Sequence, residues 1–125
     1  MAKSHPAVAV VDDEEPVRKA LQRLLRAAGF AAETFASGRD FLDSLPARRP
    51  DCLVLDLQMP GLTGLEVLRE LARAGERLPA VVITAHDEPQ SQAQCLSAGA
   101  AAYLCKPLES RVLLDAIAAA VGDAR

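Results

Sequence analysis

The sequence predicts a single α/β domain in which parallel strands form a central sheet and helices cover both of its faces. Five short apolar runs alternate with five longer stretches that have helical patterns, as is typical of parallel sheets with right-handed crossovers. Two of the runs are continuously apolar, which is expected for central strands covered on both sides. The length of 125 residues, of which 50% are hydrophobic, suits one domain with a substantial core.

The five apolar runs are mostly rich in valine, leucine and isoleucine and are bounded by turn residues, which favours strands over helices. They comprise Ala7–Val11, Ala31–Phe35, Cys52–Asp56, Ala80–Thr84 and Ala101–Cys105. The third and fourth runs are the continuous ones and are therefore predicted to lie at the centre of the sheet. In folds of this kind ligands bind beyond the carboxyl ends of the strands, so we look for chemistry there.

The stretches between the runs carry helix signals of different strength. Val17, Leu21 and Leu25 fall on one face of the first predicted helix. Thr63–Glu66 has the pattern of a capping box at the start of the third helix. The fourth predicted helix, Pro89–Ser97, has few apolar residues among its glutamines and serines, so we expect it to be the least firmly anchored.

Composition and charge exclude several classes of function. The net charge of −3 does not attract phosphate backbones, so we expect this domain itself to bind no nucleic acid. No apolar run approaches the ~18 residues of a membrane helix, and the N-terminus lacks a signal peptide, so we expect a cytoplasmic chain without membrane contact. The cysteines, Cys52, Cys95 and Cys105, have neither disulfide nor zinc-site spacing, which indicates free thiols.

Charged or reactive side chains stand at the ends of four of the five predicted strands. They are Asp12 and Asp13 after the first, Asp56 at the third, Thr84 at the fourth and Lys106 after the fifth. Singly, each has an ordinary explanation, such as an acid that complements a helix dipole or an aspartate that starts a turn. If the first and third strands are neighbours, the three aspartates converge, and their mutual repulsion calls for a cation. Oxygen ligands without a histidine or cysteine cluster favour Mg²⁺.

This set of side chains suits phosphoryl transfer to a carboxylate. A carboxylate is a weak nucleophile, but it can accept a phosphoryl group when the charge on the phosphoryl oxygens is neutralised. Mg²⁺, the Lys106 ammonium and the Thr84 hydroxyl would surround those oxygens. The chain has neither a P-loop nor a GxGxxG motif, so it is not expected to hold a nucleotide.

Together these residues resemble the receiver domain of bacterial two-component response regulators, and the resemblance covers essentially residues 1–125. It rests on the acidic pair, Asp56 with the following Met-Pro-Gly, Thr84, and Lys106-Pro107, in this order and at suitable spacing. The family implies a flavodoxin-like three-layer α/β/α sandwich with five parallel strands in the order 2-1-3-4-5. That order places the first strand beside the third.

The resemblance also implies a role for each site residue. Asp56 would be the phosphoacceptor, charged by a sensor histidine kinase or a small phosphodonor. Asp13, Asp56 and the Gln58 backbone carbonyl would bind Mg²⁺ directly, while Asp12 would act mainly through a bound water. Lys106 would contact the phosphoryl oxygens.

Three further residues belong to the implied switch and its support. Thr84 would swing toward the phosphoryl group, and Tyr103 would rotate inward into the space that is vacated. Pro107 would follow a cis peptide bond that helps to place Lys106.

The segment Phe35–Leu42 is more specifically similar to receivers of the FixJ type, which are usually attached to a C-terminal helix-turn-helix domain. This resemblance implies phosphorylation-dependent homodimerisation through the fourth helix and the fifth strand. It also implies an output in transcription regulation.

Other functions are compatible with parts of the pattern. A stand-alone receiver, or a pseudo-receiver that binds partners without phosphorylation, would use the same fold. A haloacid-dehalogenase-type phosphatase also uses Asp, Thr, Lys and Mg²⁺. Its nucleophile follows the first strand in a DxD pattern, whereas here Asp12 and Asp13 are adjacent and the chain has no room for a cap.

Three residues beside the expected site are open to more than one interpretation. Gln58 and His86 each lie two positions beyond a site residue, where a side chain could tune hydrolysis of an acyl phosphate. For His86 we favour the simpler explanation, a solvated loop residue, and do not expect a catalytic base. Cys105 directly precedes Lys106, and we expect it to be a small core-facing side chain rather than a redox centre.

Overall fold

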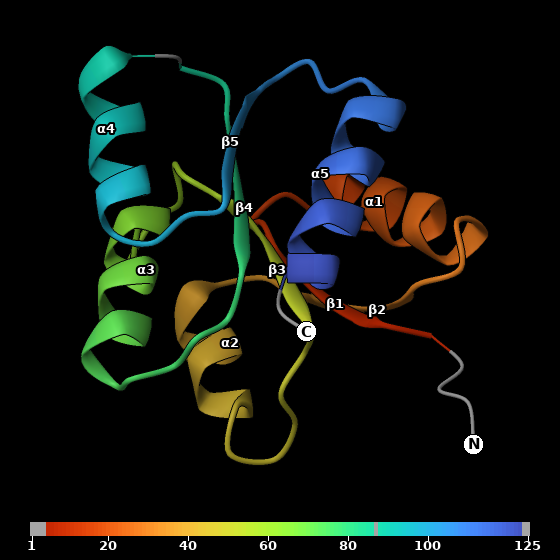
Figure 1. Ribbon diagram of the computed structural model, residues 1–125, viewed down its shortest axis with the longest axis horizontal. Helices are drawn as coiled ribbons and strands as arrows, with labels where there is room; N and C mark the ends of the chain where they lie inside the picture. The colour runs from red at the N-terminus through yellow and green to blue at the C-terminus, as the bar shows by residue number, and fades with distance from the viewer. Residues whose placement is uncertain (1–4, 87, 124–125) are drawn as a thin grey trace.

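The computed structural model describes residues 5–86 and 88–123, in which strands and helices alternate (Figure 1). The strands are β1 (Ala7–Val11), β2 (Ala31–Phe35), β3 (Cys52–Asp56), β4 (Ala80–Thr84) and β5 (Ala102–Cys105). The helices are α1 (Glu15–Ala27), α2 (Gly38–Ser44), α3 (Gly64–Arg73), α4 (Pro89–Ser97) and α5 (Ser110–Asp123). The predicted α/β class and the alternation are confirmed.

All five strands are parallel and form one sheet in the order β2-β1-β3-β4-β5. This confirms the order 2-1-3-4-5 and the proximity of the first and third strands. Val11 pairs with Leu55 across β1 and β3, and Asp56 pairs with Ile83 across β3 and β4. The register therefore brings the carboxyl ends of the three central strands to one level.

Helices cover both faces of the sheet, with α1 and α5 on one face and α2, α3 and α4 on the other (Figure 1). Alternate residues of each strand point to opposite faces, so the core divides into two clusters. One contains Leu53, Leu55 and Leu68, and the other contains Val54, Leu25 and Ile117. In the described parts of the chain no helix is both long enough and apolar enough to cross a membrane.

The centre and the edges of the sheet differ in burial. Every residue of β3 and β4 is buried, as their continuous apolar runs predicted, whereas no residue of the edge strand β5 is fully buried. β5 begins at Ala102, one residue later than predicted. The expectation that Cys105 faces the core is wrong: its side chain is exposed, because it lies at the end of an edge strand.

The start of α3 is fixed against the end of β3. Thr63 and Glu66 form the predicted capping box, in which each side chain accepts a hydrogen bond from the backbone N–H of the other. Gly64 lies so close to β3 that an added Cβ would come within 2.6 Å of the Asp56 backbone oxygen. Only glycine permits this approach, which seats the helix directly against the strand end that carries Asp56.

α4 is held by fewer interactions, as its composition predicted. Its N-cap residue, Glu88, makes no capping hydrogen bond with its side chain. Cys95 is its only buried residue, and Leu96 is 46% exposed. The helix therefore contributes little apolar surface to the core.

Candidate functional site

The ends of β1 and β3 bring three carboxylates together. Asp12 follows β1 and is fully buried, Asp56 ends β3 and is 4% exposed, and Asp13 is exposed. One carboxylate oxygen of each of the three lies within 4.8 Å of the others. The sequence predicted this convergence on the condition that β1 and β3 are neighbours, and the sheet order meets that condition.

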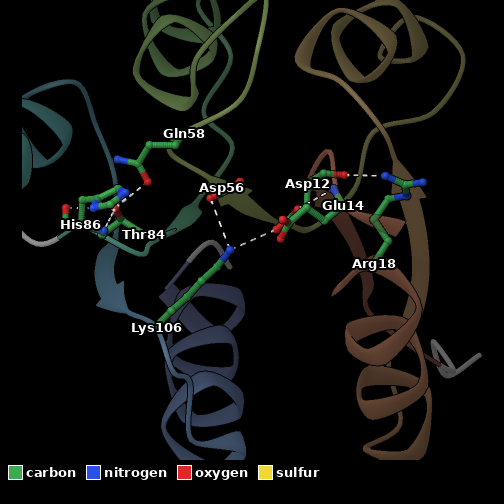
Figure 2. A network of polar contacts seen from close by, with 8 residues as sticks. All are labelled: Asp12, Glu14, Arg18, Asp56, Gln58, Thr84, His86 and Lys106. Atoms are coloured by element: carbon green, nitrogen blue, oxygen red, sulfur yellow. Dashed lines mark hydrogen bonds and ion pairs between the residues drawn. The ribbon is translucent and has the colours of Figure 1, made fainter. Parts of the chain in front are cut away.

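Lys106 approaches the carboxylates from the end of β5. Its Nζ atom lies 3.6 Å from Asp12 Oδ2 and 3.7 Å from Asp56 Oδ1, so it forms ion pairs with both (Figure 2). These distances are longer than a direct hydrogen bond. The ammonium therefore partly offsets the negative charge but does not hydrogen-bond to the carboxylate oxygens. The Lys106–Pro107 peptide bond is cis, as the resemblance implied.

The turn after β1 holds Asp12 in place. Its Oδ1 accepts a hydrogen bond of 2.9 Å from the Glu14 N–H, and its backbone carbonyl accepts one of 2.8 Å from the Arg18 guanidinium (Figure 2). Among the described residues, Asp12 Oδ2 is buried and receives no hydrogen bond. Its ion pair with Lys106 at 3.6 Å is longer than a hydrogen bond, so a cation at the site would supply the closer partner that a buried anionic oxygen needs. The sequence analysis did not predict that Arg18 would bond the Asp12 carbonyl, because a charged residue near the start of a helix gives no specific signal for such a contact.

The electrostatics of the site are unfavourable without a cation. Burial and repulsion from Asp12 raise the pKa of the Asp56 carboxyl from 3.8 to about 6, with a further upward contribution from Asp13. The Lys106 ammonium lowers this pKa but does not compensate for the other effects. One ammonium against three carboxylates leaves the cluster short of positive charge.

The residues fit a hard divalent cation. The donors are carboxylate oxygens, which Mg²⁺ prefers, and the exposed Asp13 leaves a route for water to reach the site. Asp12, Asp13 and Asp56 would hold the ion or its water ligands. When bound, Mg²⁺ supplies charge neutralisation for the carboxylates and for an incoming anionic group.

Thr84, at the end of β4, is fully buried, and its hydroxyl is engaged by neighbours other than Asp56. The hydroxyl donates to Gln58 Oε1 at 2.8 Å and accepts from the His86 N–H at 3.0 Å (Figure 2). The His86 carbonyl oxygen is a second acceptor at 3.1 Å. The contact with Gln58 was not predicted, although its position two residues after Asp56 marked its side chain as one that lies near the site.

Tyr103 lies on the same face of the sheet as Thr84, but two residues nearer the start of the strands. It pairs with Val82, two residues before Thr84. Its half-buried ring packs against the core cluster beneath α3 and α4. The structure therefore brings the three aspartates, Lys106, Gln58 and Thr84 to one edge, with Tyr103 below Thr84 beside α4.

The chain is similar to known proteins over most of its length. A family model described as a response regulator receiver domain matches residues 8–118. The response regulator MprA of Mycolicibacterium vanbaalenii is 44% identical over 107 residues, which are 86% of this chain and 46% of that protein. The transcriptional regulatory protein FixJ of Rhizobium meliloti is 41% identical over 110 residues, which are 88% of this chain and 54% of that protein. The chain thus spans about half the length of these relatives.

Solved structures agree with the sequence comparisons. A crystal structure of FixJ-N superposes with a TM-score of 0.89 at 38% identity, covering 98% of this chain and 96% of that one. Full-length FixJ from B. japonicum superposes with a TM-score of 0.91 at 32% identity, covering 98% of this chain and 61% of that one. The likeness to FixJ therefore extends over both sequence and fold.

Proposed function

Because the chain belongs to the response regulator receiver domain family, we propose that Asp56 accepts a phosphoryl group from a phosphohistidine of a sensor histidine kinase. One observation carries the proposal: three carboxylates lie within 4.8 Å of one another, and Lys106 Nζ lies within 3.7 Å of two of them. We further propose that the whole chain, residues 1–125, is one receiver domain. As a receiver, it is a phosphoacceptor rather than an enzyme acting on other substrates.

The chemistry divides among the residues of the site. An Asp56 oxygen forms a bond to phosphorus as the phosphorus–nitrogen bond of the donor breaks, and the leaving imidazole nitrogen keeps the electron pair and takes up a proton. Lys106 approaches the developing charge on the phosphoryl oxygens. Asp13, Asp56 and the Gln58 backbone carbonyl, which lies in the loop directly after β3, would hold Mg²⁺ directly, and Asp12 would act mainly through a bound water.

The signal leaves the site through the side of the molecule formed by β4, β5 and α4. We propose that the Thr84 hydroxyl turns toward the phosphoryl group and that the Tyr103 ring follows inward. The weak anchoring of α4 supports this route, because a helix with one buried residue shifts at small free-energy cost.

The output proposed for the chain is transcription regulation by an attached domain. The support is that the relatives are response regulators, FixJ among them a transcriptional regulatory protein, and that the chain spans about half of their length. Phosphorylation-dependent homodimerisation through α4, β5 and α5 would couple the switch to that output. We also propose a cytoplasmic location, because phosphotransfer from a kinase and control of transcription would both take place there.

The test is phosphorylation by acetyl phosphate with Mg²⁺, followed by mass spectrometry. We expect one phosphoryl group on the unaltered chain, none after chelation of Mg²⁺, and none in Asp56→Asn. Asp115→Asn is the matched control, since Asp115 is an exposed aspartate on α5. Labelling that survives in Asp56→Asn would contradict the assignment, and absence of labelling in the unaltered chain would favour the pseudo-receiver.

A further inference from the structure

The side chain of Gln58 makes a contact that the proposed chemistry does not use. It belongs to the loop after β3, whereas the Thr84 hydroxyl that it contacts at 2.8 Å ends the neighbouring strand β4 (Figure 2). Gln58 is exposed and Thr84 is fully buried. An exposed amide thus reaches inward to the buried hydroxyl of the expected switch residue.

Counting donors and acceptors shows what this contact excludes. A threonine hydroxyl has one proton to donate and two lone pairs to accept with. In this structure one lone pair receives the His86 N–H, and the proton is directed to Gln58 Oε1, with the His86 carbonyl as the alternative acceptor. The proton that would bond a phosphoryl oxygen on Asp56 is therefore already committed elsewhere.

We infer that Gln58 is a positioning residue whose hydrogen bond holds the Thr84 hydroxyl in the unphosphorylated arrangement. This bond shifts the conformational equilibrium away from the phosphorylated state. The inference rests on the proposed phosphorylation of Asp56. Thr84 can bond the phosphoryl group only when it releases Gln58, so the two hydrogen bonds compete for one proton. The free energy of the Gln58–Thr84 bond is subtracted from the gain that Thr84 brings to the phosphorylated form.

The size of the effect follows from the setting of the bond. A neutral hydrogen bond that competes with water contributes modestly to an equilibrium, and in its absence the hydroxyl can still bond the His86 carbonyl. Replacing Gln58 by methionine, which has similar length and no acceptor oxygen, should therefore tighten the binding of a phosphoryl analogue by about two- to fivefold.

The experiment titrates the chain with beryllium fluoride at saturating Mg²⁺ and follows the populations of free and bound forms by amide NMR. Gln58→Met should bind beryllium fluoride more tightly than the unaltered chain, and its His86 amide resonance should move in the free form, because its hydrogen-bond acceptor Thr84 is released. Gln92→Met, the same change at an exposed position of α4, should bind as the unaltered chain does.

A double-mutant cycle separates this role from a general effect on the site. In a Thr84→Val background the hydroxyl is gone, so adding Gln58→Met should change the affinity no further. Equal affinity of Gln58→Met and the unaltered chain, or tightening that persists in the Thr84→Val background, would overturn the inference while leaving the proposed function intact. If beryllium fluoride fails to bind the unaltered chain, the proposed function itself fails and the inference falls with it.

Discussion

α3 and α4 follow neighbouring strands and lie side by side on one face of the sheet, yet they are anchored very differently (Figure 1). α3 begins with a capping box and seats Gly64 against β3, and its buried residues are Gly64, Val67, Leu68 and Leu71. α4 begins without a side-chain cap and buries only Cys95. The difference matches the roles proposed for the strands that they follow.

The strand before α3 carries Asp56, which in the proposed function has to keep its position relative to Asp12 so that both can serve one cation while Asp56 accepts the phosphoryl group. The strand before α4 carries Thr84, which the proposed switch requires to move. A firmly packed helix beside the proposed acceptor and a loosely packed helix beside the hydroxyl that is proposed to move would allow one site to be both well positioned and responsive. The following substitutions test this contrast, from the largest expected effect to the smallest.

Truncation of one leucine on each helix should break the contrast most clearly. Leu68 on α3 is 3% exposed, so Leu68→Ala leaves a cavity and should lower the free energy of unfolding by about 3 kcal/mol. Leu96 on α4 is 46% exposed, and Leu96→Ala should change the free energy of unfolding by less than about 0.5 kcal/mol. Urea denaturation measures both values. Similar losses in the two variants would show that α4 is anchored as firmly as α3.

The carboxylate beside α3 should also make stability depend on pH. Below its ordinary pKa of 3.8, Asp56 is neutral in both the folded and unfolded chain; as pH rises through about 6, the folded chain must accept a buried charge. The metal-free chain should therefore lose stability as pH rises from about 4 to 8, by an amount on the order of 2 kcal/mol.

Asp56→Asn removes this dependence. Without metal the variant should be more stable than the unaltered chain near pH 8 and close to it near pH 4, as measured by denaturation at a series of pH values in the presence of a chelator. Mg²⁺ should stabilise the unaltered chain near pH 8 and stabilise the variant much less. The raised pKa of Asp56 would be contradicted if, without metal, the unaltered chain became more stable relative to Asp56→Asn as the pH rises from 4 to 8.

Removal of the α3 cap should have a smaller effect. Thr63→Ala deletes the side chain that accepts from the Glu66 N–H and should lower the free energy of unfolding by about 1 kcal/mol. Glu88→Ala at the matching position of α4 removes no capping bond and serves as the control. Thermal denaturation should separate the two variants by several degrees.

Supplying a cap to α4 should sharpen the contrast in the opposite direction. Glu88 has the extended backbone conformation of an N-cap, with φ −121° and ψ 135°, and Glu88→Ser would place a hydroxyl there. We expect a gain of about 0.5 kcal/mol in the free energy of unfolding. Hydrogen exchange of the α4 amides should slow accordingly, and unchanged exchange would show that the missing cap does not limit this helix.

The sequence predicted the sheet well because burial controls its strands. The fully buried strands β3 and β4 have the predicted bounds, since their continuous apolar runs are set by helices on both faces. The start of β5 was predicted one residue too early, at Ala101, whereas the other edge strand, β2, has the predicted bounds. The proximity of Asp12 and Asp56 was predicted for the same reason, as it follows from strand order and not from side-chain detail.

The parts that sequence reasoning missed depend on individual side-chain conformations. The bond from Thr84 to Gln58 joins residues 26 positions apart, and neither residue type signals the other. The contact of Arg18 with the Asp12 carbonyl depends on how the first turn of α1 lies against the strand end. The exposure of Cys105 depends on what covers the end of an edge strand, which periodicity along one strand does not reveal.

The course of α5 has a consequence for how the chain can signal. The helix starts near the edge that carries Asp56 and runs back toward the edge where the strands begin (Figure 1). Its 14 residues span about 20 Å, from the carboxyl ends of the strands toward their amino ends. Anything joined beyond α5 thus emerges far from the acceptor, out of direct reach of the transferred group. If Asp56 is phosphorylated as proposed, the signal would therefore have to reach such a segment through a conformational change on the side of the molecule between these two ends of the sheet.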